Sequence, residues 1–192
     1  MAEKKNTKSP EKELTREERV GAELYDWISC LIMALIICIV AFMFLVRVID
    51  VIGTSMNDTL YEGDKMLVSN VLYKPKQGDI VVFKKDEYDP NKALVKRVIA
   101  TEGQTINIDF DQGIVYVNGE PIEEPYIREL TMTKLDFIGP KTVPEGCVFV
   151  MGDNRNASID SRRKEIDMVD TRLILGKVYA VLYPMSSMRL LP

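Results

Sequence analysis

The chain has 192 residues and no histidine. A serine hydroxyl is a weak nucleophile and needs a neighbouring general base before it attacks a carbonyl group. Without histidine, a Ser-His-Asp triad is excluded, and so is any zinc site built on imidazole ligands. If a serine of this chain is a nucleophile, its base must therefore be a lysine, an aspartate or a glutamate. Of these arrangements, the Ser-Lys pair is the leading one.

Cysteine is scarce, and the net charge is small and negative. Of the three cysteines, Cys30 and Cys38 lie in a long apolar run, and only Cys147 lies in the rest of the chain. A disulfide within residues 47–192 is therefore excluded by counting. The net charge of −4 at pH 7 gives no reason to expect nucleic acid as a partner.

One long stretch, residues 27–46, contains no charged side chain. A helix of that length spans about 30 Å, the thickness of the hydrocarbon core of a bilayer. The apolar core of a secretory signal peptide is shorter and precedes a small-residue cleavage site, so we interpret the stretch as a retained anchor. The residues before it are rich in charges of both signs, which is typical of a solvated tail.

The basic residues on the two sides of this stretch predict its orientation. The N-terminal flank carries six of them, and the other flank has only Arg47 and Lys65 nearby. By the positive-inside rule, the tail is cytoplasmic and the following domain lies outside the membrane. We therefore expect a cytoplasmic tail at 1–26, a transmembrane helix at 27–46 and an extracytoplasmic domain at 47–192, which is long enough for a core of its own.

Residues 47–192 have the pattern of an all-β domain. Short runs rich in Val, Ile and Leu, separated by Gly, Pro and Asp, predict strands at 65–72, 79–84, 93–100, 105–109, 113–117, 147–151 and 172–182. Asn118-Gly119 is the strongest short signal for a hairpin turn. The only helix predicted in this region is a short one at 162–168.

The stretch 50–60 begins four residues after the apolar run and contains the turn Gly53-Thr54-Ser55-Met56. This turn puts the small hydroxyl of Ser55 just beyond the predicted membrane surface, where it is a candidate nucleophile. The ordinary alternative is a loop serine without a chemical role. Two later segments favour the first interpretation.

The first is the strand at 93–100, which carries Lys96 and Arg97 side by side among apolar residues. Neighbours in a strand point to opposite faces, and both faces of this strand are apolar. We therefore expect one of the two basic side chains to lie in the dry interior. Lysine is the better candidate, because burial lowers its pKa from about 10.4 towards neutrality, whereas arginine stays charged. The alternative is a lysine facing solvent on an edge strand.

The second segment, residues 151–162, follows a predicted strand and is dense in polar side chains. Its two arginines and two aspartates can form a fixed frame of ion pairs, and Ser158 can donate to or accept from a buried amine. The ordinary alternative is a polar turn held by Asx-type hydrogen bonds.

Together these segments resemble bacterial type I signal peptidases, membrane-anchored Ser-Lys endopeptidases that remove signal peptides from exported proteins. The resemblance runs in order from about residue 27 to 183. The matching stretches are Gly53-Thr54-Ser55-Met56 with Thr59-Leu60 and Gly63-Asp64; Gly78-Asp79-Ile80-Val81-Val82-Phe83; Val95-Lys96-Arg97-Val98-Ile99; and Gly152-Asp153-Asn154-Arg155 through Ser158 and Asp160-Ser161-Arg162.

The resemblance implies a role for five residues. By position, Ser55 is the nucleophile and Lys96 the general base. Ser158 supplies the hydroxyl that orients the lysine amine, and Asp160 and Arg162 form the ion pair that braces the site. The implied fold is a mostly antiparallel β-sheet domain behind one N-terminal transmembrane helix, of the compact Gram-positive type.

Three positions depart from the family pattern. Asp58 stands where the family usually has proline, and Ala157 stands where a polar residue is common. Gly53 occupies the position at which some members place a serine hydroxyl in the oxyanion hole. The Ser55 backbone N–H remains a candidate donor to the oxyanion, and the second donor is open.

The resemblance further implies signal-peptide-bearing preproteins and the lipid bilayer as partners, with no metal and no cofactor. Small substrate side chains at positions −1 and −3 would enter shallow apolar pockets, which we expect Ile52, Val81 and Val82 to line. A self-cleaving transcriptional regulator of the same Ser-Lys class would need a DNA-binding domain where this chain has its apolar run. A non-enzymatic anchored scaffold would leave Ser55 and Lys96 far apart or solvated.

Overall fold

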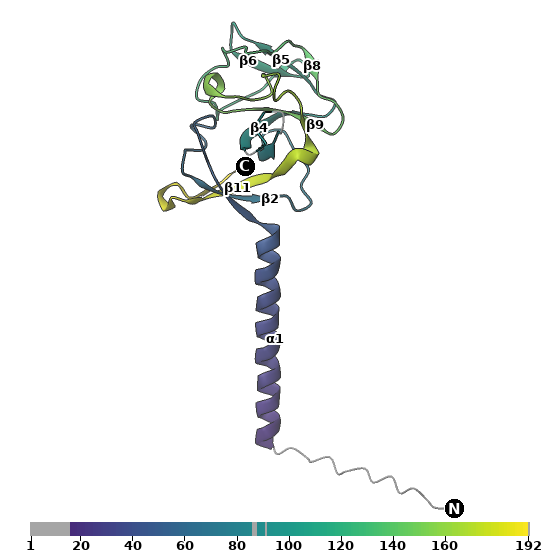
Figure 1. Ribbon diagram of the computed structural model, residues 1–192, viewed down its shortest axis with the longest axis vertical. Coiled ribbons are helices and arrows are strands. Elements are labelled where there is room, and N and C mark those ends of the chain that lie inside the picture. The colour runs from purple at the N-terminus through teal and green to yellow at the C-terminus, as the bar shows by residue number, and fades with distance from the viewer. Residues whose placement is uncertain (1–15, 86–87, 91, 192) are drawn as a thin grey trace, which may run out of the picture. The chain divides into compact units, whose positions relative to one another are not determined.

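The computed structural model describes residues 16–85, 88–90 and 92–191, which divide into two units at residues 44 and 45. The first unit is the greater part of helix α1 (Arg16–Leu45), shown in Figure 1. The second unit contains the strands β1 (Arg47–Asp50), β2 (Lys65–Ser69), β3 (Ile80–Lys84), β4 (Ala93–Thr101), β5 (Thr105–Asp109), β6 (Ile114–Val117), β7 (Glu120–Pro121), β8 (Lys141–Thr142), β9 (Cys147–Met151), β10 (Val169–Asp170), β11 (Ile174–Tyr183) and β12 (Arg189–Leu190). Three single-turn helices, η1 (Arg155–Ala157), η2 (Thr171–Leu173) and η3 (Met185–Ser187), lie between them.

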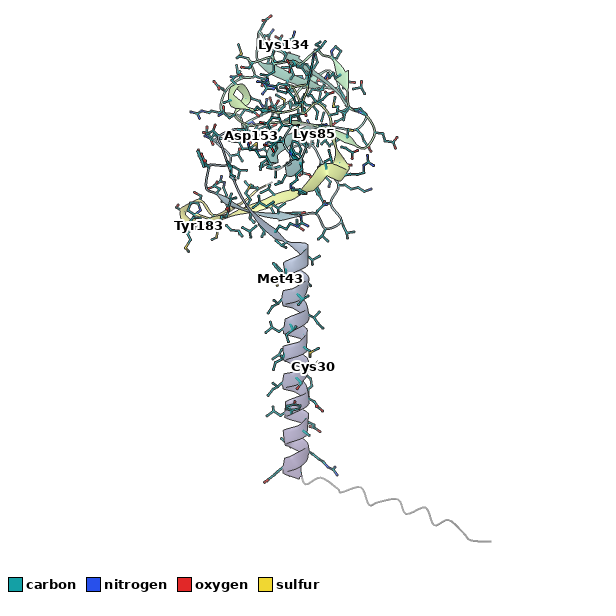
Figure 2. The ribbon with its side chains drawn as sticks, viewed as in Figure 1. Cys30, Met43, Lys85, Lys134, Asp153 and Tyr183 are labelled. Atoms are coloured by element: carbon teal, nitrogen blue, oxygen red, sulfur yellow. The ribbon has the colours of Figure 1, made fainter. Side chains whose placement is uncertain are left out.

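Helix α1 begins before the predicted apolar stretch and takes in charged residues from Arg16 onward. Its part from Arg19 to Met43 is long and apolar enough to cross a membrane. Side chains such as Cys30 and Met43 point outward from the helix, as Figure 2 shows, and Trp27 is 78% exposed. A helix that is apolar on all sides needs an apolar surrounding, either other protein or lipid.

The strands of the second unit form two sheets, and every strand pairing in the described residues is antiparallel. The larger sheet has the order β1-β2-β11-β3-β4-β9-β10, with β12 paired to β11, and the smaller one has the order β7-β6-β5-β8. In Figure 1 the smaller sheet lies beyond β4 and β9. The predicted mostly antiparallel β fold with one N-terminal apolar helix is confirmed.

Most predicted strands are present with small differences at their ends. The strands predicted at 105–109 and 147–151 coincide with β5 and β9, and the other five overlap β2, β3, β4, β6 and β11. The Asn118-Gly119 turn is also present: both residues have positive φ, 53° and 84°, and Val117 pairs with Glu120 across it. Two such residues form the type I′ turn that matches the twist of a hairpin.

The short helix predicted at 162–168 is wrong. Residues 161–167 form successive turns, in which the Arg163 N–H donates to the Asp160 carbonyl and the Asp167 N–H donates to the Arg163 carbonyl. Asp167 adopts a left-handed φ of 44°, which ends any helical run at this point. The prediction also missed β1 and four strands of two residues each, which are too short for a sequence pattern to show.

The part of the core that positions the Ser55 turn is built from both sides of that turn. The turn connects β1 to β2, whose register pairs Asp50 with Lys65. Val51, Met56 and Leu60 point inward from it and are at most 4% exposed. They pack against buried residues of β2, β3 and β11, namely Met66, Val68, Ile80, Val82, Val178 and Val181. Full burial of each such side chain contributes about 1.5–3 kcal/mol, so the turn is fixed to the sheet on both sides of Ser55.

Candidate active site

Ser55 lies in a tight turn whose backbone is internally hydrogen-bonded. The Asn57 N–H donates to the Thr54 carbonyl at 3.2 Å, and the Leu60 N–H donates to the Met56 carbonyl at 2.8 Å. Gly53, just before the turn, has a φ of +86°, a backbone conformation that favours glycine. The Ser55 side chain is only partly buried, whereas its neighbour Met56 is in the core. The turn therefore presents the Ser55 hydroxyl at the surface of the domain from a rigid base.

The Lys96 amine is in direct contact with this hydroxyl. Lys96 Nζ lies 2.6 Å from Ser55 Oγ and 2.8 Å from the carbonyl oxygen of Val95. Lys96 is 2% exposed, and this burial lowers its pKa from the ordinary 10.5 to about 8. The negative charges of Asp160 and Asp153 act in the opposite direction, and Arg162 acts in the same direction as burial. Loss of hydration thus has the largest effect on the pKa, and it increases the fraction of Lys96 that is unprotonated near neutral pH.

Arg97 is buried as well, on the other side of β4. The expected burial of Lys96 is confirmed, but the burial of Arg97 beside it was not expected, and both side chains are 2% exposed. Arg97 Nε and Nη2 donate to the two carboxylate oxygens of Asp153 at 2.9 and 2.6 Å, and Nη1 donates to the Gly78 carbonyl at 2.8 Å. A buried guanidinium is tolerated when a carboxylate pairs with it. Arg97 therefore stays charged beside a counterion, whereas Lys96 faces a neutral hydroxyl.

Asp160 and Arg162 form the ion pair that was predicted, at 2.9 Å and in full burial. Burial alone would raise the pKa of the Asp160 carboxyl, but the hydrogen bonds and charge of Arg162 hold it below its ordinary value. The same carboxylate accepts a hydrogen bond from the Gly152 N–H at 3.1 Å. Arg162 Nη1 also donates to the Thr133 carbonyl at 2.8 Å. This pair therefore fixes residues 152–162 at both ends.

Ser158 is buried close to the pair and contributes to the lowered pKa of the Asp160 carboxyl, but its hydroxyl forms no hydrogen bond of ordinary geometry within the described residues. The predicted bond between Ser158 and the Lys96 amine is accordingly not formed here. Ser158 lies against Gly152: a Cβ atom at position 152 would be 2.3 Å from Ser158 Oγ and 2.4 Å from the Ser55 carbonyl oxygen. Only glycine allows so close an approach of the two serine-bearing segments.

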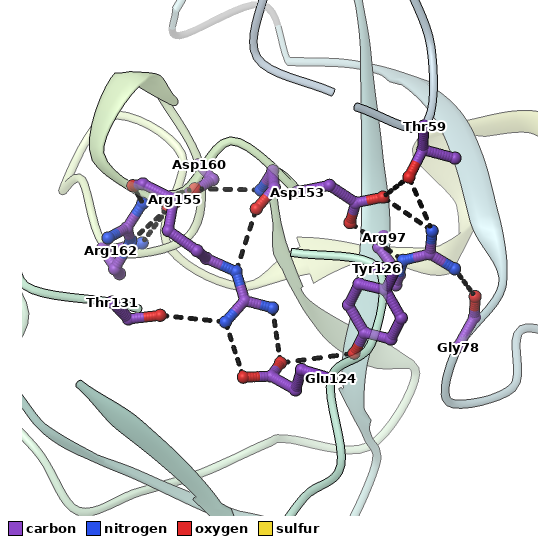
Figure 3. Close-up of polar contacts among 11 residues, drawn as sticks. Thr59, Gly78, Arg97, Glu124, Tyr126, Thr131, Asp153, Arg155, Asp160 and Arg162 are labelled. Carbon is purple, nitrogen blue, oxygen red and sulfur yellow. Dashed lines mark hydrogen bonds and ion pairs between the residues drawn. The ribbon is translucent and has the colours of Figure 1, made fainter. Parts of the chain in front are cut away.

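Hydrogen bonds of Asn154 and Asp153 that the sequence did not predict join the Ser55 turn to this segment. The Asn154 backbone N–H donates to the Ser55 carbonyl at 3.1 Å, and its side-chain amide donates to the Thr54 carbonyl at 3.0 Å. Asp153 accepts a hydrogen bond of 2.5 Å from the Thr59 hydroxyl (Figure 3). Asp153 and Asn154 lie inside one of the matching stretches, so the motif contained the signal, but the partners lie about a hundred residues away.

A cleft of about 470 Å³ opens beside Ser55 and Lys96. Its apolar lining includes Ile52, Leu94, Val95, Ala157 and Ile159. Ile52 is 87% exposed and lines the cleft as predicted, but Val81 and Val82 do not. These two valines are fully buried, because they point to opposite faces of β3 and each face packs into a core cluster of its own. Leu94, Val95 and Ile159 line the cleft in their place.

The parts of the chain that the structure describes contain no group of three or more Cys, Asp or Glu side chains placed to hold a metal ion. The chemistry available at the site is that of a hydroxyl, a buried amine of lowered pKa and an apolar cleft. This combination suits attack of a serine oxygen on a carbonyl group, with the amine as base.

The chain is similar to several known proteins. The family model for signal peptidase, peptidase S26, matches residues 24–183. A signal peptidase I of Bacillus licheniformis is 37% identical over 177 residues, covering 86% of this chain and 92% of that protein. A probable signal peptidase I-1 of Synechocystis is 41% identical over 143 residues, covering 70% of each chain. A crystal structure of a signal peptidase I from Enterococcus faecalis has 28% identity and a TM-score of 0.46, and covers 55% of this chain and 97% of that one. On the family match and the relatives' coverage, the chain belongs to the signal peptidase I family of proteases.

Proposed function

We propose that this protease cleaves signal peptides with Ser55 as nucleophile and Lys96 as general base. The observation that carries the proposal is the 2.6 Å contact between Ser55 Oγ and a Lys96 amine that is almost fully buried. A non-enzymatic scaffold would have no need for this costly arrangement, because burying an amine without a counterion opposes folding.

In the first step, neutral Lys96 takes the proton of Ser55 Oγ as the oxygen attacks the scissile carbonyl. The peptide bond breaks to give an acyl-enzyme, and the Lys96 ammonium returns its proton to the leaving amine. Neutral Lys96 then activates a water molecule for deacylation. We assign the Ser55 backbone N–H as one donor to the oxyanion.

Ser158, Asp160 and Arg162 support this chemistry without forming bonds to substrate. The Asp160–Arg162 pair fixes the segment that carries Ser158, whose hydroxyl lies beside Asp160 without a hydrogen bond of ordinary geometry in the described residues and would turn to a lysine ammonium. The apolar cleft beside Ser55 suits the small side chains at positions −1 and −3 of a signal peptide, with Ile52 and Ile159 at its lining.

We further propose that α1 anchors the enzyme in the bilayer as a single transmembrane helix. The division into a cytoplasmic tail at 1–26, a membrane span at 27–46 and an extracytoplasmic domain at 47–192 rests on the apolar part of α1 and on the basic residues before it. An anchor of this kind restricts the enzyme to the surface at which signal peptides end.

Ser55→Ala tests the proposal most directly. We expect the detergent-solubilised variant to leave a preprotein unprocessed, because no other hydroxyl is in contact with the Lys96 amine in the described residues. The matched control is Ser186→Ala, which removes an exposed serine of η3 and should process the preprotein at the normal rate. Substantial cleavage by pure Ser55→Ala would remove Ser55 from the mechanism.

A further inference from the structure

The loop between β7 and β8 of the smaller sheet packs along the segment that carries Ser158. We call residues 124–133 of this loop the clasp. The backbone of the clasp forms five hydrogen bonds with residues 153–162. The Arg128 N–H donates to the Asp153 carbonyl at 3.2 Å, and the Thr133 carbonyl accepts from Arg162 Nη1 at 2.8 Å. The Asn156 side chain forms the other three: its Oδ1 accepts from the Met132 and Thr133 N–H groups at 3.0 and 2.9 Å, and its Nδ2 donates to the Leu130 carbonyl at 3.0 Å. The smaller sheet is thereby joined to the candidate active site.

Glu124 is the countercharge of a fully buried arginine in this segment. Its carboxylate accepts two hydrogen bonds from the Arg155 guanidinium, one of them 2.8 Å from Nη1 to Oε2. Arg155 is 0% exposed, and its Nε donates to the Gly152 carbonyl at 3.0 Å. Thr131 accepts a further bond from Nη1 at 2.9 Å (Figure 3). A buried cation without a partner is strongly unfavourable, so the position of Arg155 depends on Glu124.

Tyr126 covers Arg97, the buried arginine that follows Lys96 in β4. The Arg97 guanidinium carbon lies 3.9 Å from the centre of the Tyr126 ring, which is the geometry of a cation–π contact. The same guanidinium donates to Asp153 along its edge. The Tyr126 ring therefore covers the face of the Arg97 guanidinium, and the Asp153 carboxylate pairs with its edge. The Tyr126 hydroxyl donates to Glu124 Oε1 at 3.2 Å, which links the two clasp side chains to each other (Figure 3).

These contacts converge on both members of the Ser55–Lys96 pair. Arg97 follows Lys96 in β4, and its partner Asp153 also holds Thr59 in the turn after Ser55. Arg155 holds Gly152, which lies against the Ser55 carbonyl. A shift of about 1 Å in either element is enough to slow a reaction about 10²-fold.

We propose that Glu124 and Tyr126 are positioning residues of the active site, which act on the dyad through Arg155 and Arg97. This role rests on the proposed function of Ser55 and Lys96. The smaller sheet is accordingly a part of the catalytic architecture, because it supplies the loop that holds the base strand and the nucleophile turn in register.

The test compares the full-length, detergent-solubilised enzyme with Glu124→Gln, which keeps the shape and removes the charge, and with Tyr126→Leu and Tyr126→Phe. Glu123→Gln is the matched control, because it removes the same charge from the exposed neighbour. Preprotein cleavage is measured as kcat and KM, and kcat is divided by the fraction folded at the assay temperature, taken from thermal unfolding. We expect kcat per folded enzyme to fall about tenfold or more in Glu124→Gln and Tyr126→Leu, with KM changed by less than about threefold, because the clasp does not line the cleft.

Tyr126→Phe keeps the ring over Arg97 and should retain kcat within about threefold, which separates stacking from the hydroxyl. The pH dependence of the rate supplies a second readout, because a simple loss of folded enzyme lowers the rate without moving the pH at which it rises. The charged groups that act on Lys96 are Asp153, Asp160 and Arg162, and burial lowers its pKa more than any of them shifts it. Asp153 raises the pKa of the Lys96 amine. Removal of the ring admits water beside the Arg97–Asp153 pair and screens this charge, so the rising limb of the rate should move to lower pH in Tyr126→Leu.

Values of kcat per folded enzyme within about twofold of wild type in both Glu124→Gln and Tyr126→Leu, with an unmoved pH limb, would overturn the positioning role. If Glu124→Gln does not fold, the comparison of Tyr126→Leu with Tyr126→Phe decides the question. Ser55→Ala is measured in parallel. Processing by that variant overturns the dyad itself, whereas an inactive Ser55→Ala beside normal clasp variants overturns only the positioning role.

Discussion

Lys96 offers the sharpest test of the mechanism, because a base must be neutral when it acts. With a pKa of about 8, about one enzyme molecule in ten carries a neutral amine at pH 7. With the ordinary value of 10.5, the fraction would be about one in 3,000. Burial thus increases the active form about 300-fold at neutral pH. We expect kcat/KM to rise about tenfold per pH unit below pH 8 and to level off above it.

Lys96→Arg removes the titratable amine and keeps a positive charge of similar reach. An arginine stays protonated at every pH of the assay, so we expect cleavage to fall about 10³-fold or more and the rising limb to disappear. Arg97→Lys is the matched control. This variant keeps a positive charge opposite Asp153 but loses the paired hydrogen bonds of the guanidinium, so it should be less stable than the wild type. It should still cleave the preprotein measurably, and its rate should rise over nearly the same pH range as that of the wild type.

The assay is the initial rate of preprotein processing from pH 6 to pH 11 for the wild type and both variants, at matched amounts of folded enzyme. A rising limb centred above pH 10 in the wild type would show that burial does not tune this lysine. Near-normal activity of Lys96→Arg would refute the Ser55–Lys96 dyad and move the base to a carboxylate or to another lysine.

Three further predictions concern stability, packing and topology. Lys96 has a lower pKa in the folded state than in the unfolded one, so its stability penalty is absent above pH 10.5, grows as the pH falls and is complete below about 8. The free energy of unfolding of Lys96→Met, measured with urea, should therefore rise relative to that of the wild type by about 3 kcal/mol as the pH falls from 10.5 to 8. In Gly152→Ala the new Cβ would meet Ser158 Oγ at 2.3 Å and displace the serine. The kcat of this variant, measured per folded enzyme, should therefore fall about 10²-fold. A wild-type kcat would contradict the close packing. Protease added outside intact cells should digest residues 47–192 and spare residues 1–26, and the reverse pattern would invert the orientation.

The sequence was sufficient to predict the strands that carry the site and the pairing of its two central residues. The absence of histidine left lysine as the base, and the matching stretches pointed to Ser55 and Lys96, which lie 2.6 Å apart. The burial of Arg97 was not predictable in the same way. Its countercharge, Asp153, is 56 residues away in the chain, and only the fold brings the two together.

The pocket prediction failed because a strand pattern does not tell how many faces of the strand are covered. Val81 and Val82 point to opposite faces, and either one would line a cleft if β3 had a free side. In the structure, β3 lies between β4 and β11, and the two valines belong to two different core clusters. The cleft is lined instead by β4 residues such as Leu94, at the end of the strand nearest the nucleophile turn.

The buried arginines explain how the Lys96 amine keeps a lowered pKa among carboxylates. The charges of Asp160 and Asp153 both raise the pKa of the Lys96 amine, and a free carboxylate in contact with it would keep it protonated. Each of these carboxylates is already paired, Asp153 with Arg97 and Asp160 with Arg162. The arginines therefore occupy the acceptors that would otherwise form a salt bridge with the lysine, and the amine is left to a neutral hydroxyl and a backbone carbonyl. In this fold the permanently charged arginines neutralise the carboxylates around Lys96, so that its amine can lose its proton.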